Sequence, residues 1–253
     1  MNLMEHLQPH VLIPLNIGGL DVSITNAVLT IWIACALVFL TMTLAGRMGK
    51  LVPKGLQNMM ESLVSFAKNT LVVEIMGEDG LVWFPFIATL FFFILFCDLL
   101  GLVPKMFTPT SNINVTATLA VIVFICSQGA GILKHGIGGY CSTFVPKGMP
   151  GGIAGLVLKG FMIIIEIISM FARPFSLAVR LFANMTAGHL VIMVFISMIF
   201  MFQGTVIKIF ITPTSVVMAV VMMAFEIFVS VLQAFIFAIL ASIYISLAVH
   251  PEH

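Results

Sequence analysis

The final apolar segment of the chain, from Thr214 to Val249, runs for 36 residues without a glycine or a proline. As one α-helix it would be about 54 Å long at about 1.5 Å per residue, whereas the hydrocarbon core of a bilayer is about 30 Å thick. Because no turn residue divides the segment, we expect one steeply tilted helix, held by packing against a protein partner rather than by lipid.

The composition places the whole chain in the membrane class. Hydrophobic residues make up 61% of the chain and charged residues 8%, against about 25% charged residues in soluble domains. Eleven basic and ten acidic residues leave no basic surface for nucleic acid, and no GxxxxGK[ST] loop is present for direct nucleotide binding. No HExxH spacing indicates a metal site, and no cofactor is predicted. We therefore expect lipid and other membrane subunits as partners.

Segments of spanning length predict an all-α membrane protein with a single membrane domain over residues 1–253. Residues 56–76 mix apolar and charged side chains, which predicts an amphipathic helix at the membrane interface. A hairpin connection at residues 202–213 and a kink near Pro174 complete the predicted layout. We expect about five membrane-embedded helices, the last two long and strongly tilted, at residues 27–45, 81–103, 113–133, 156–202 and 214–249.

Basic residues mark two loops as facing the cytoplasm or its equivalent. By the positive-inside tendency, the end of the first span and the loop after the third span are inner, which places the N-terminal segment, residues 1–26, outside. The basic residues are Arg47, Lys50 and Lys54 after the first span, and Lys134, Lys147 and Lys159 around the second inner loop.

One face of the penultimate helix is polar along its length. Successive polar residues are 3, 4, 3, 4 and 4 positions apart, the spacings that stack side chains on one helical face. His189 follows nine positions after Arg180, about 180° further round, and should serve a different surface or a widened cavity. The residues on the polar face are Glu166, Ser169, Arg173, Ser176, Arg180 and Asn184.

The final helix also confines its polar residues to one side. Glu226, Ser230, Gln233 and Tyr244 fall within one face, at offsets of 4, 7 and 18 positions from the first of them. Ionisable residues inside spans usually line water-filled paths or pair across helices. The two polar faces therefore favour proton or ion conduction.

Some of these residues also have structural interpretations. Arg173 can snorkel to the inner interface, and Glu166 can pair with it from seven positions away. The serines can pack or bond back to the backbone, Asp98 can cap an interface, and His189 can be a satisfied core histidine. Arg180 is different, because it lies far from either end of its helix. A charge at mid-bilayer costs about 2.5–3.5 kcal/mol even on the most lenient insertion scale.

The most specific motif surrounds this arginine, in the sequence Arg180-Leu-Phe-Ala-Asn184-Met-Thr-Ala-Gly-His189. Together with Glu226 and Leu-Gln233-Ala-Phe-Ile-Phe, it closely resembles the a subunit of the F-type ATP synthase. The resemblance covers most of the chain from about residue 80. It includes Asp98-Leu-Leu-Gly-Leu-Val-Pro104, Asn112-Ile-Asn114-Val-Thr116, Lys134-His-Gly-Ile-Gly-Gly139 and residues 166–176.

The resemblance implies a proton-conducting stator subunit whose two long, tilted helices face a rotating ring of c subunits, each with one essential carboxyl group. Arg180 matches the family's essential arginine, which attracts arriving carboxylates and blocks direct proton leakage between two half-channels. Implied partners are the c ring, the peripheral-stalk b subunits, lipid and protons, with no catalytic activity in this chain alone. The outer half-channel is matched by His189, Glu226, Asn184, Gln233 and Asp98, and the inner one by Glu166, Ser169, Arg173 and Ser176.

One departure concerns the histidine and the carboxylate. Many bacterial members carry Glu where this chain has His189 and His where it has Glu226, whereas mitochondrial and some bacterial members share the exchanged pair. A relay between a histidine and a carboxylate is kept either way. We expect a bacterial inner membrane rather than a mitochondrial one, with the proton as the default coupling ion.

Two other functional classes remain as alternatives. A self-contained proton or cation antiporter or channel should show inverted repeats and broken helices, and the sequence shows neither. A purely structural membrane scaffold would leave the polar face of the penultimate helix unexplained. Transport by the purified chain alone would indicate an antiporter, whereas a subunit a would be inert without its ring.

Overall fold

The computed structural model describes residues 10–14, 16–17, 20–21, 23–48, 54–103, 106–143, 153–202 and 207–250. Within them, five helices are long and apolar enough to cross a membrane, which confirms the expected all-α membrane fold. The helices are α1 (Asn26–Met48), α4 (Phe84–Gly101), α5 (Ile113–Thr143), α6 (Ile153–Met201) and α7 (Lys208–Val249). The expected inner-loop residues Lys50 and Lys147 lie outside the described residues.

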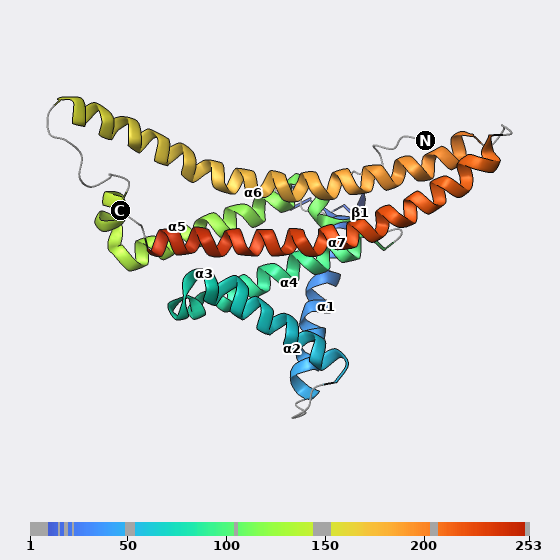
Figure 1. The fold of residues 1–253 in the computed structure, drawn as a ribbon, viewed down its shortest axis with the longest axis horizontal. Helices are drawn as coiled ribbons and strands as arrows, with labels where there is room; N and C mark the ends of the chain where they lie inside the picture. The colour runs from blue at the N-terminus through green and yellow to red at the C-terminus, as the bar shows by residue number, and fades with distance from the viewer. Residues whose placement is uncertain are drawn as a thin grey trace.

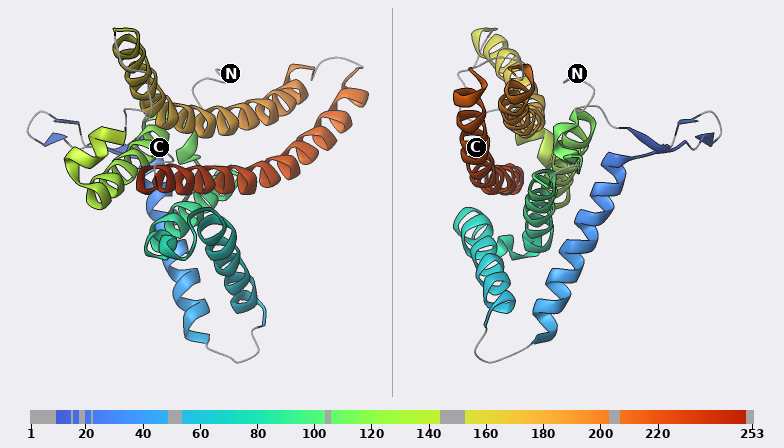
Figure 2. Two further views of the ribbon diagram at one scale, coloured as in Figure 1. Left: turned by 60° about the vertical axis from the view of Figure 1, so that its left-hand side comes forward. Right: turned by 90° about the vertical axis from the view of Figure 1, so that its right-hand side faces the viewer.

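The two longest helices, α6 and α7, run side by side in opposite directions across the molecule (Figure 1). α1 lies at a steep angle to both of them, and the right-hand view in Figure 2, which looks nearly along α6 and α7, shows α1 crossing their direction. A bilayer spanned by α1 would hold α6 and α7 strongly tilted. Their lengths of 49 and 42 residues require such a tilt, because an upright helix of that length would extend far beyond the hydrocarbon core.

The segment expected at the membrane interface is helical throughout but changes its winding. α2 (Leu56–Phe66) continues into a π-helical turn, η2 (Ala67–Val73), and ends in α3 (Glu74–Met76). The wider π turn places Ala67 and Leu71 on one fully buried face, and η2 contacts α4 and α7. The second half of this amphipathic segment therefore packs on the protein rather than on lipid alone.

Prolines do not end the two long helices. Pro174 lies inside α6, which is curved rather than broken in Figure 1. Pro213 lies inside α7, so that helix begins at Lys208, and the expected connection at residues 202–213 is shorter than predicted. A proline so near the start of a helix removes only one early backbone hydrogen bond, which leaves the rest of the helix intact.

Two further features differ from the expected layout. α5 continues to Thr143, with a break at Gly136, where φ of +70° lies in the region that only glycine adopts readily. Short antiparallel strands precede α1, and the sequence patterns did not predict them. They are β1 (Val11–Ile13) with β4 (Ile24–Thr25), and β2 (Asn16–Ile17) with β3 (Leu20–Asp21).

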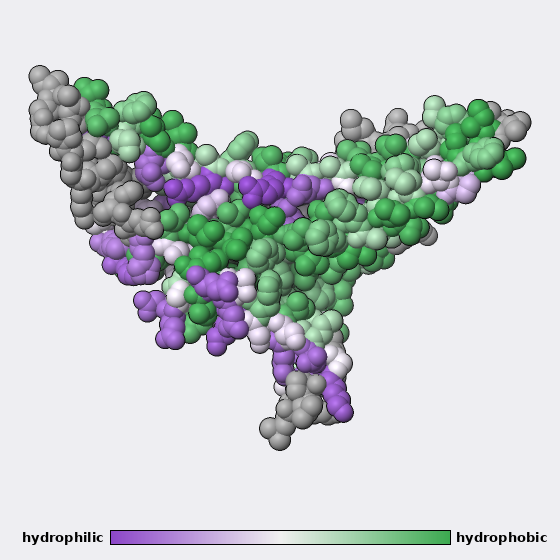
Figure 3. All heavy atoms as spheres, viewed as in Figure 1, coloured by the Kyte–Doolittle hydropathy of each residue, from purple (hydrophilic) through white to green (hydrophobic). Residues whose placement is uncertain are grey.

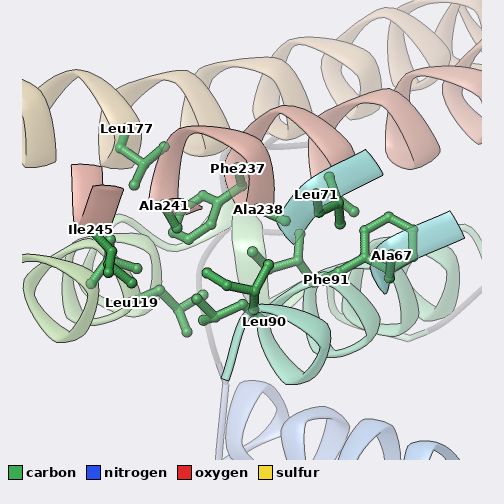
Figure 4. Packing of buried hydrophobic residues seen from close by; sticks show 14 of the residues in the cluster. Ala67, Leu71, Leu90, Phe91, Leu119, Leu177, Phe237, Ala238, Ala241 and Ile245 are labelled. Carbon is green, nitrogen blue, oxygen red and sulfur yellow. The ribbon is translucent and has the colours of Figure 1, made fainter. Parts of the chain in front are cut away.

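The hydrophobic core surrounds α7 where it meets α4, α5, α6 and η2 (Figure 4). Small residues of α7 allow close helix approach, since Ala234, Ala238 and Ala241 are fully buried. The labelled core residues come from all five elements: Ala67, Leu71, Leu90, Phe91, Leu119, Leu177, Phe237, Ala238, Ala241 and Ile245. The outward faces of the spans are largely apolar, as the green surface in Figure 3 shows. Such faces suit contact with lipid or with other membrane subunits.

Candidate functional site

Polar residues gather where α4, α6 and α7 meet the chain that leads into α5. Asp98 comes from α4, Thr108 and Thr110 come from the chain before α5, and the others come from α6 and α7. We define the polar cluster as Asp98, Thr108, Thr110, Asn184, His189, Glu226 and Gln233. A second set, the polar stripe, comprises Glu166, Ser169, Arg173 and Ser176 of α6.

Asp98 is the most deeply buried carboxyl group of the polar cluster. It lies near the end of α4, is 0% exposed, and its Oδ1 accepts a hydrogen bond from Thr110 Oγ1. Thr110 belongs to η4 (Pro109–Ser111), a short 3-10 turn in which Ser111 Oγ donates to the carbonyl of Thr108 at 2.7 Å. Asp98 therefore lies inside the protein, not at an exposed interface where it would cap a helix.

His189 lies between partners from two different elements. Its Nδ1 is 3.3 Å from Glu226 Oε1 on α7, an ion-pairing distance when the imidazole is protonated. Its Nε2 contacts the hydroxyl of Thr108, which lies just before η4. Both partners are 3% exposed, so the imidazole has an acidic group on one nitrogen and a hydroxyl on the other, both inside the protein.

Glu226 approaches the backbone of α6 beside Gly188. A Cβ added to Gly188 would lie 2.7 Å from Glu226 Oε1 and 3.0 Å from its Cδ, closer than real Cβ atoms approach such groups. Any larger residue at this position would push the carboxyl group away. The glycine next to His189 is therefore part of the geometry that brings the two ionisable groups together.

The predicted polar side of the final helix is buried in the structure. Glu226, Ser230 and Gln233, at successive offsets of four and three residues, all face the interior. Gln233 Oε1 accepts a hydrogen bond from Asn184 Nδ2 of α6 at 2.7 Å. Ser230 Oγ donates back to the carbonyl of Glu226 at 2.8 Å, so this serine has a local structural partner.

Several polar atoms of the cluster lack a well-aligned hydrogen-bond partner within the described residues. They are Asp98 Oδ2, both carboxyl oxygens of Glu226 and Gln233 Nε2. Leaving such an atom buried and unpaired costs about 1–3 kcal/mol, so all of these atoms are suited to contact with water, and the carboxyl oxygens are also suited to receive a transferred proton. The unpaired atoms belong to α4 and α7.

The polar stripe has more exposed surroundings. Arg173 pairs with Glu166 at 3.5 Å, and their side chains are 34% and 41% exposed. The Arg173 guanidinium also lies 6.0 Å from the centroid of the Tyr244 ring on α7. In the part of the chain that the structure describes, neither Ser169 nor Ser176 has a side-chain hydrogen bond. Figure 3 shows hydrophilic surface along α6 with apolar surface on either side.

Arg180 lies on the exposed side of α6. Its neighbours Leu177 and Leu181 are buried against the core. Ser176, Arg180 and Asn184, which are four positions apart, lie on the exposed side of the helix. Among the described residues, no hydrogen bond or ion pair to Arg180 is formed. A permanent positive charge is thus presented at the surface of a spanning helix, between the stripe and the cluster.

Comparison with known proteins identifies the family. A family profile described as ATP synthase A chain matches residues 28–246, which is most of the sequence. The chain belongs to the ATP synthase subunit a family. It is therefore a multi-pass membrane subunit of an ATP synthase complex, in a family with a role in proton translocation.

Similar proteins cover nearly the whole chain. Subunit a of Magnetococcus marinus is 42% identical over 254 residues, which cover 99% of this chain and 93% of that protein. Subunit a of Parvibaculum lavamentivorans is 41% identical over 250 residues, 96% of this chain and 91% of that protein. Subunit a of Chloroherpeton thalassium is 42% identical over 245 residues, 94% of this chain and 71% of that protein.

The structure adds residues that sequence reasoning missed. Thr108 and Thr110 lie in the short connection before α5, and their hydroxyls contact His189 and Asp98. Gly188 belongs with them because the carboxyl group of Glu226 packs against it. A run of hydroxyl residues next to a proline, Thr108-Pro-Thr-Ser111, was the available signal in the sequence. No group of three or more His, Cys, Asp or Glu residues that could hold a metal ion occurs among the described residues.

Proposed function

We propose that this subunit a forms two offset half-channels for protons and couples proton flow to rotation of a ring of c subunits. The observation that carries the proposal is the unpaired Arg180 on the exposed side of a spanning helix, between two separate groups of polar residues. A charge in that position requires a partner of opposite sign. A ring carboxylate from another chain would supply that partner.

In this proposal, the polar cluster lines the outer half-channel. Its members join α4, α6 and α7 through contacts between side chains, and unpaired carboxyl and amide atoms occur along the same region. His189 and Glu226 lie close enough to exchange a proton, directly or through one water molecule. Protons would pass along this cluster to a carboxylate of the ring.

The polar stripe would line the inner half-channel. Its side chains are partly exposed, and the ring would cover them together with Arg180 on the same helix. Arg180 then lies between the two paths. Its positive charge favours loss of the proton from an arriving carboxyl group and opposes direct passage of a proton between the paths.

The offset of the two paths is what makes the proton flow useful. A membrane potential supplies about 2.3 kcal/mol per elementary charge per 100 mV. A continuous pore would dissipate this energy as heat. When the two paths are separated by Arg180, a proton crosses only on a moving ring carboxyl group, so its passage requires rotation.

The proposed partners and cellular location follow from membership of an ATP synthase complex. The proposed partners are the c ring, peripheral-stalk b subunits, lipid and protons, and the proposed location is a bacterial inner membrane. The largely apolar outer faces of the spans provide surface for these contacts. Nucleotide chemistry would belong to other subunits of the complex.

Replacing Arg180 by alanine in the complete complex tests the proposal. We expect Arg180→Ala to reduce the rate of ATP-driven proton pumping in membrane vesicles by at least about 100-fold. Losses of this size are usual when a group that stabilises a reacting charge is removed. Passive proton leakage through the complex should persist or increase, because the barrier between the paths is removed. Pumping near the unmodified rate would overturn the proposed role.

Two controls make the result specific. Arg47→Ala removes a basic residue from the last turn of α1, outside both polar groups, and should leave pumping unchanged. Equal amounts of subunits a and c in the membranes would show that the complex assembles. The purified subunit a alone should carry no ions across vesicles, and transport by it alone would indicate a self-contained antiporter instead.

A further inference from the structure

We propose that the hydroxyl of Thr108 is a positioning group for His189, and that Gly101 provides the space this hydroxyl needs. This inference rests on the proposed function, because it assigns a task to His189 in proton transfer. Thr108 and Gly101 themselves belong to neither long helix. The carrying observation is that Thr108 Oγ1 contacts the ring nitrogen of His189 that points away from Glu226.

A histidine that gains and loses protons needs a neighbouring group that can hydrogen-bond to it in both protonation states. When the imidazole is protonated, Nε2 carries a hydrogen and needs an acceptor. When Nε2 is unprotonated, it needs a donor. A hydroxyl meets both needs by rotating about one bond, whereas a backbone carbonyl can only accept and an ammonium group can only donate. Thr108 can therefore hold the ring in one orientation through both states.

The orientation matters because the other nitrogen faces Glu226. With Nε2 fixed on Thr108, Nδ1 is held 3.3 Å from Glu226 Oε1. Rotation of the ring about its bond to Cβ would break both contacts together. The partner at one nitrogen of a histidine determines which proton the other nitrogen carries and where it points. Thr108 would act in this way on the pair formed by His189 and Glu226.

The position of Thr108 depends on close packing against the end of α4. A Cβ added to Gly101 would overlap the Thr108 side chain, including its hydroxyl oxygen. Thr108 itself is 3% exposed and cannot move outward without leaving His189. The α4 end also carries Asp98, which binds Thr110 two residues further along. The same short connection thus contacts both Asp98 and His189.

The decisive experiment compares valine and serine at position 108 in the complete complex. Valine has nearly the shape of threonine without the hydroxyl, whereas serine keeps the hydroxyl and loses a methyl group. We expect Thr108→Val to reduce passive proton flow, in vesicles stripped of the catalytic sector, by about tenfold or more, within the range typical of positioned proton-transfer groups. Thr108→Ser should stay within about twofold of the unmodified protein, since its hydroxyl can bond His189 in both states.

A double variant separates positioning from packing. In a His189→Ala background, Thr108→Val should cause no further loss, because the group it positions is gone. Gly101→Ala should resemble Thr108→Val, since the added methyl group displaces the hydroxyl. The matched control is Thr89→Val on α4, whose hydroxyl bonds the carbonyl of Pro85, and it should leave the flow unchanged.

The outcomes distinguish this inference from the proposed function. Normal flow in Thr108→Val, or equal losses in the valine and serine variants, would overturn the role of the hydroxyl while leaving the half-channels in place. An additive loss in the His189→Ala background would show a packing effect and would also overturn it. Normal proton flow in His189→Ala alone would instead count against the proposed outer half-channel. Immunoblots for subunits a and c would confirm that each variant assembles.

Discussion

The polar cluster is assembled from α4, α6, α7 and the chain before α5, whereas the polar stripe lies along α6, with Arg173 near the Tyr244 ring of α7. Glu226 of the cluster is 3% exposed, and the side chain of Glu166 in the stripe is 41% exposed. Each group thus contains one glutamate, and the two glutamates lie in opposite surroundings. One group is built within the chain, and the other is left open on the side where Arg180 also lies.

The difference shows which part of a proton path one chain can complete. A buried polar group must be paired or hydrated, and its neighbours must be placed accurately, so one folded chain has to supply them. An exposed polar face tolerates loose placement, because water or a partner can complete it. The cluster should therefore respond to small changes of shape, and the stripe should respond mainly to loss of its partner.

The sharpest test of this comparison is the same substitution in both groups. Glu226→Gln keeps the shape of the side chain but cannot release a proton, and the buried position leaves little room for a substitute. We expect passive proton flow to fall by at least about tenfold, as for other positioned proton-transfer groups. Glu166→Gln should change the flow by about twofold or less, because water can replace an exposed partner.

Both variants should be measured in vesicles with equal amounts of assembled complex. The comparison between cluster and stripe would break if the two substitutions reduced proton flow equally. It would be reversed if Glu166→Gln had the larger effect. In either case the exposed stripe would contain an essential proton carrier, and its exposure in the isolated chain would not describe its surroundings beside the ring.

A second test uses two glycines of the same helix. Gly188→Ala would place a methyl group 2.7 Å from Glu226 Oε1, whereas Gly160 has no atom within 4 Å of an added Cβ. We expect Gly188→Ala to slow proton flow by about three- to tenfold, because displacing a reacting group by about 1 Å can cost up to about 10²-fold. Gly160→Ala should be neutral or slightly stabilising, since alanine favours a helix by about 1 kcal/mol over glycine.

A compensating change sharpens this second test. Glu226→Asp shortens the carboxylate side chain and should relieve the overlap created by Gly188→Ala. Partial recovery in the double variant would show that the overlap with Glu226 is the cause. If the losses of proton flow in the two single variants add up in the double variant, the loss in Gly188→Ala arises from another property of α6.

The sequence predicted those features that depend on periodicity and length. The five spanning segments and the shared face of Glu166, Arg173 and Arg180 follow from helical spacing, which local sequence determines directly. Spacing also indicated that His189 lies away from Arg180. The structure places His189 beside Glu226 of α7.

The remaining features depend on contacts between distant parts of the chain. Thr108 reaches His189, 81 positions away, through a connection whose path no local pattern sets. The π-helical turn Ala67–Val73 and the continuation of α7 through Pro213 are cases in which packing overrides local preference. The sequence also could not predict solvent exposure. The spacing that grouped Ser230 with Glu226 does not show which face of the helix is buried.

The smallest expected effect concerns the contact between Arg173 of the stripe and Tyr244 of α7. The Arg173 guanidinium lies 6.0 Å from the centroid of the Tyr244 ring, and such a contact contributes about 0.5–1 kcal/mol at an exposed site. If this contact positions Arg173 during proton exit, Tyr244→Leu should slow proton flow by about two- to fivefold. Tyr244→Phe keeps the ring and should leave the flow unchanged. Equal losses in both variants would show that the hydroxyl matters, and the stripe would then contain a polar partner from α7 in addition to its own helix.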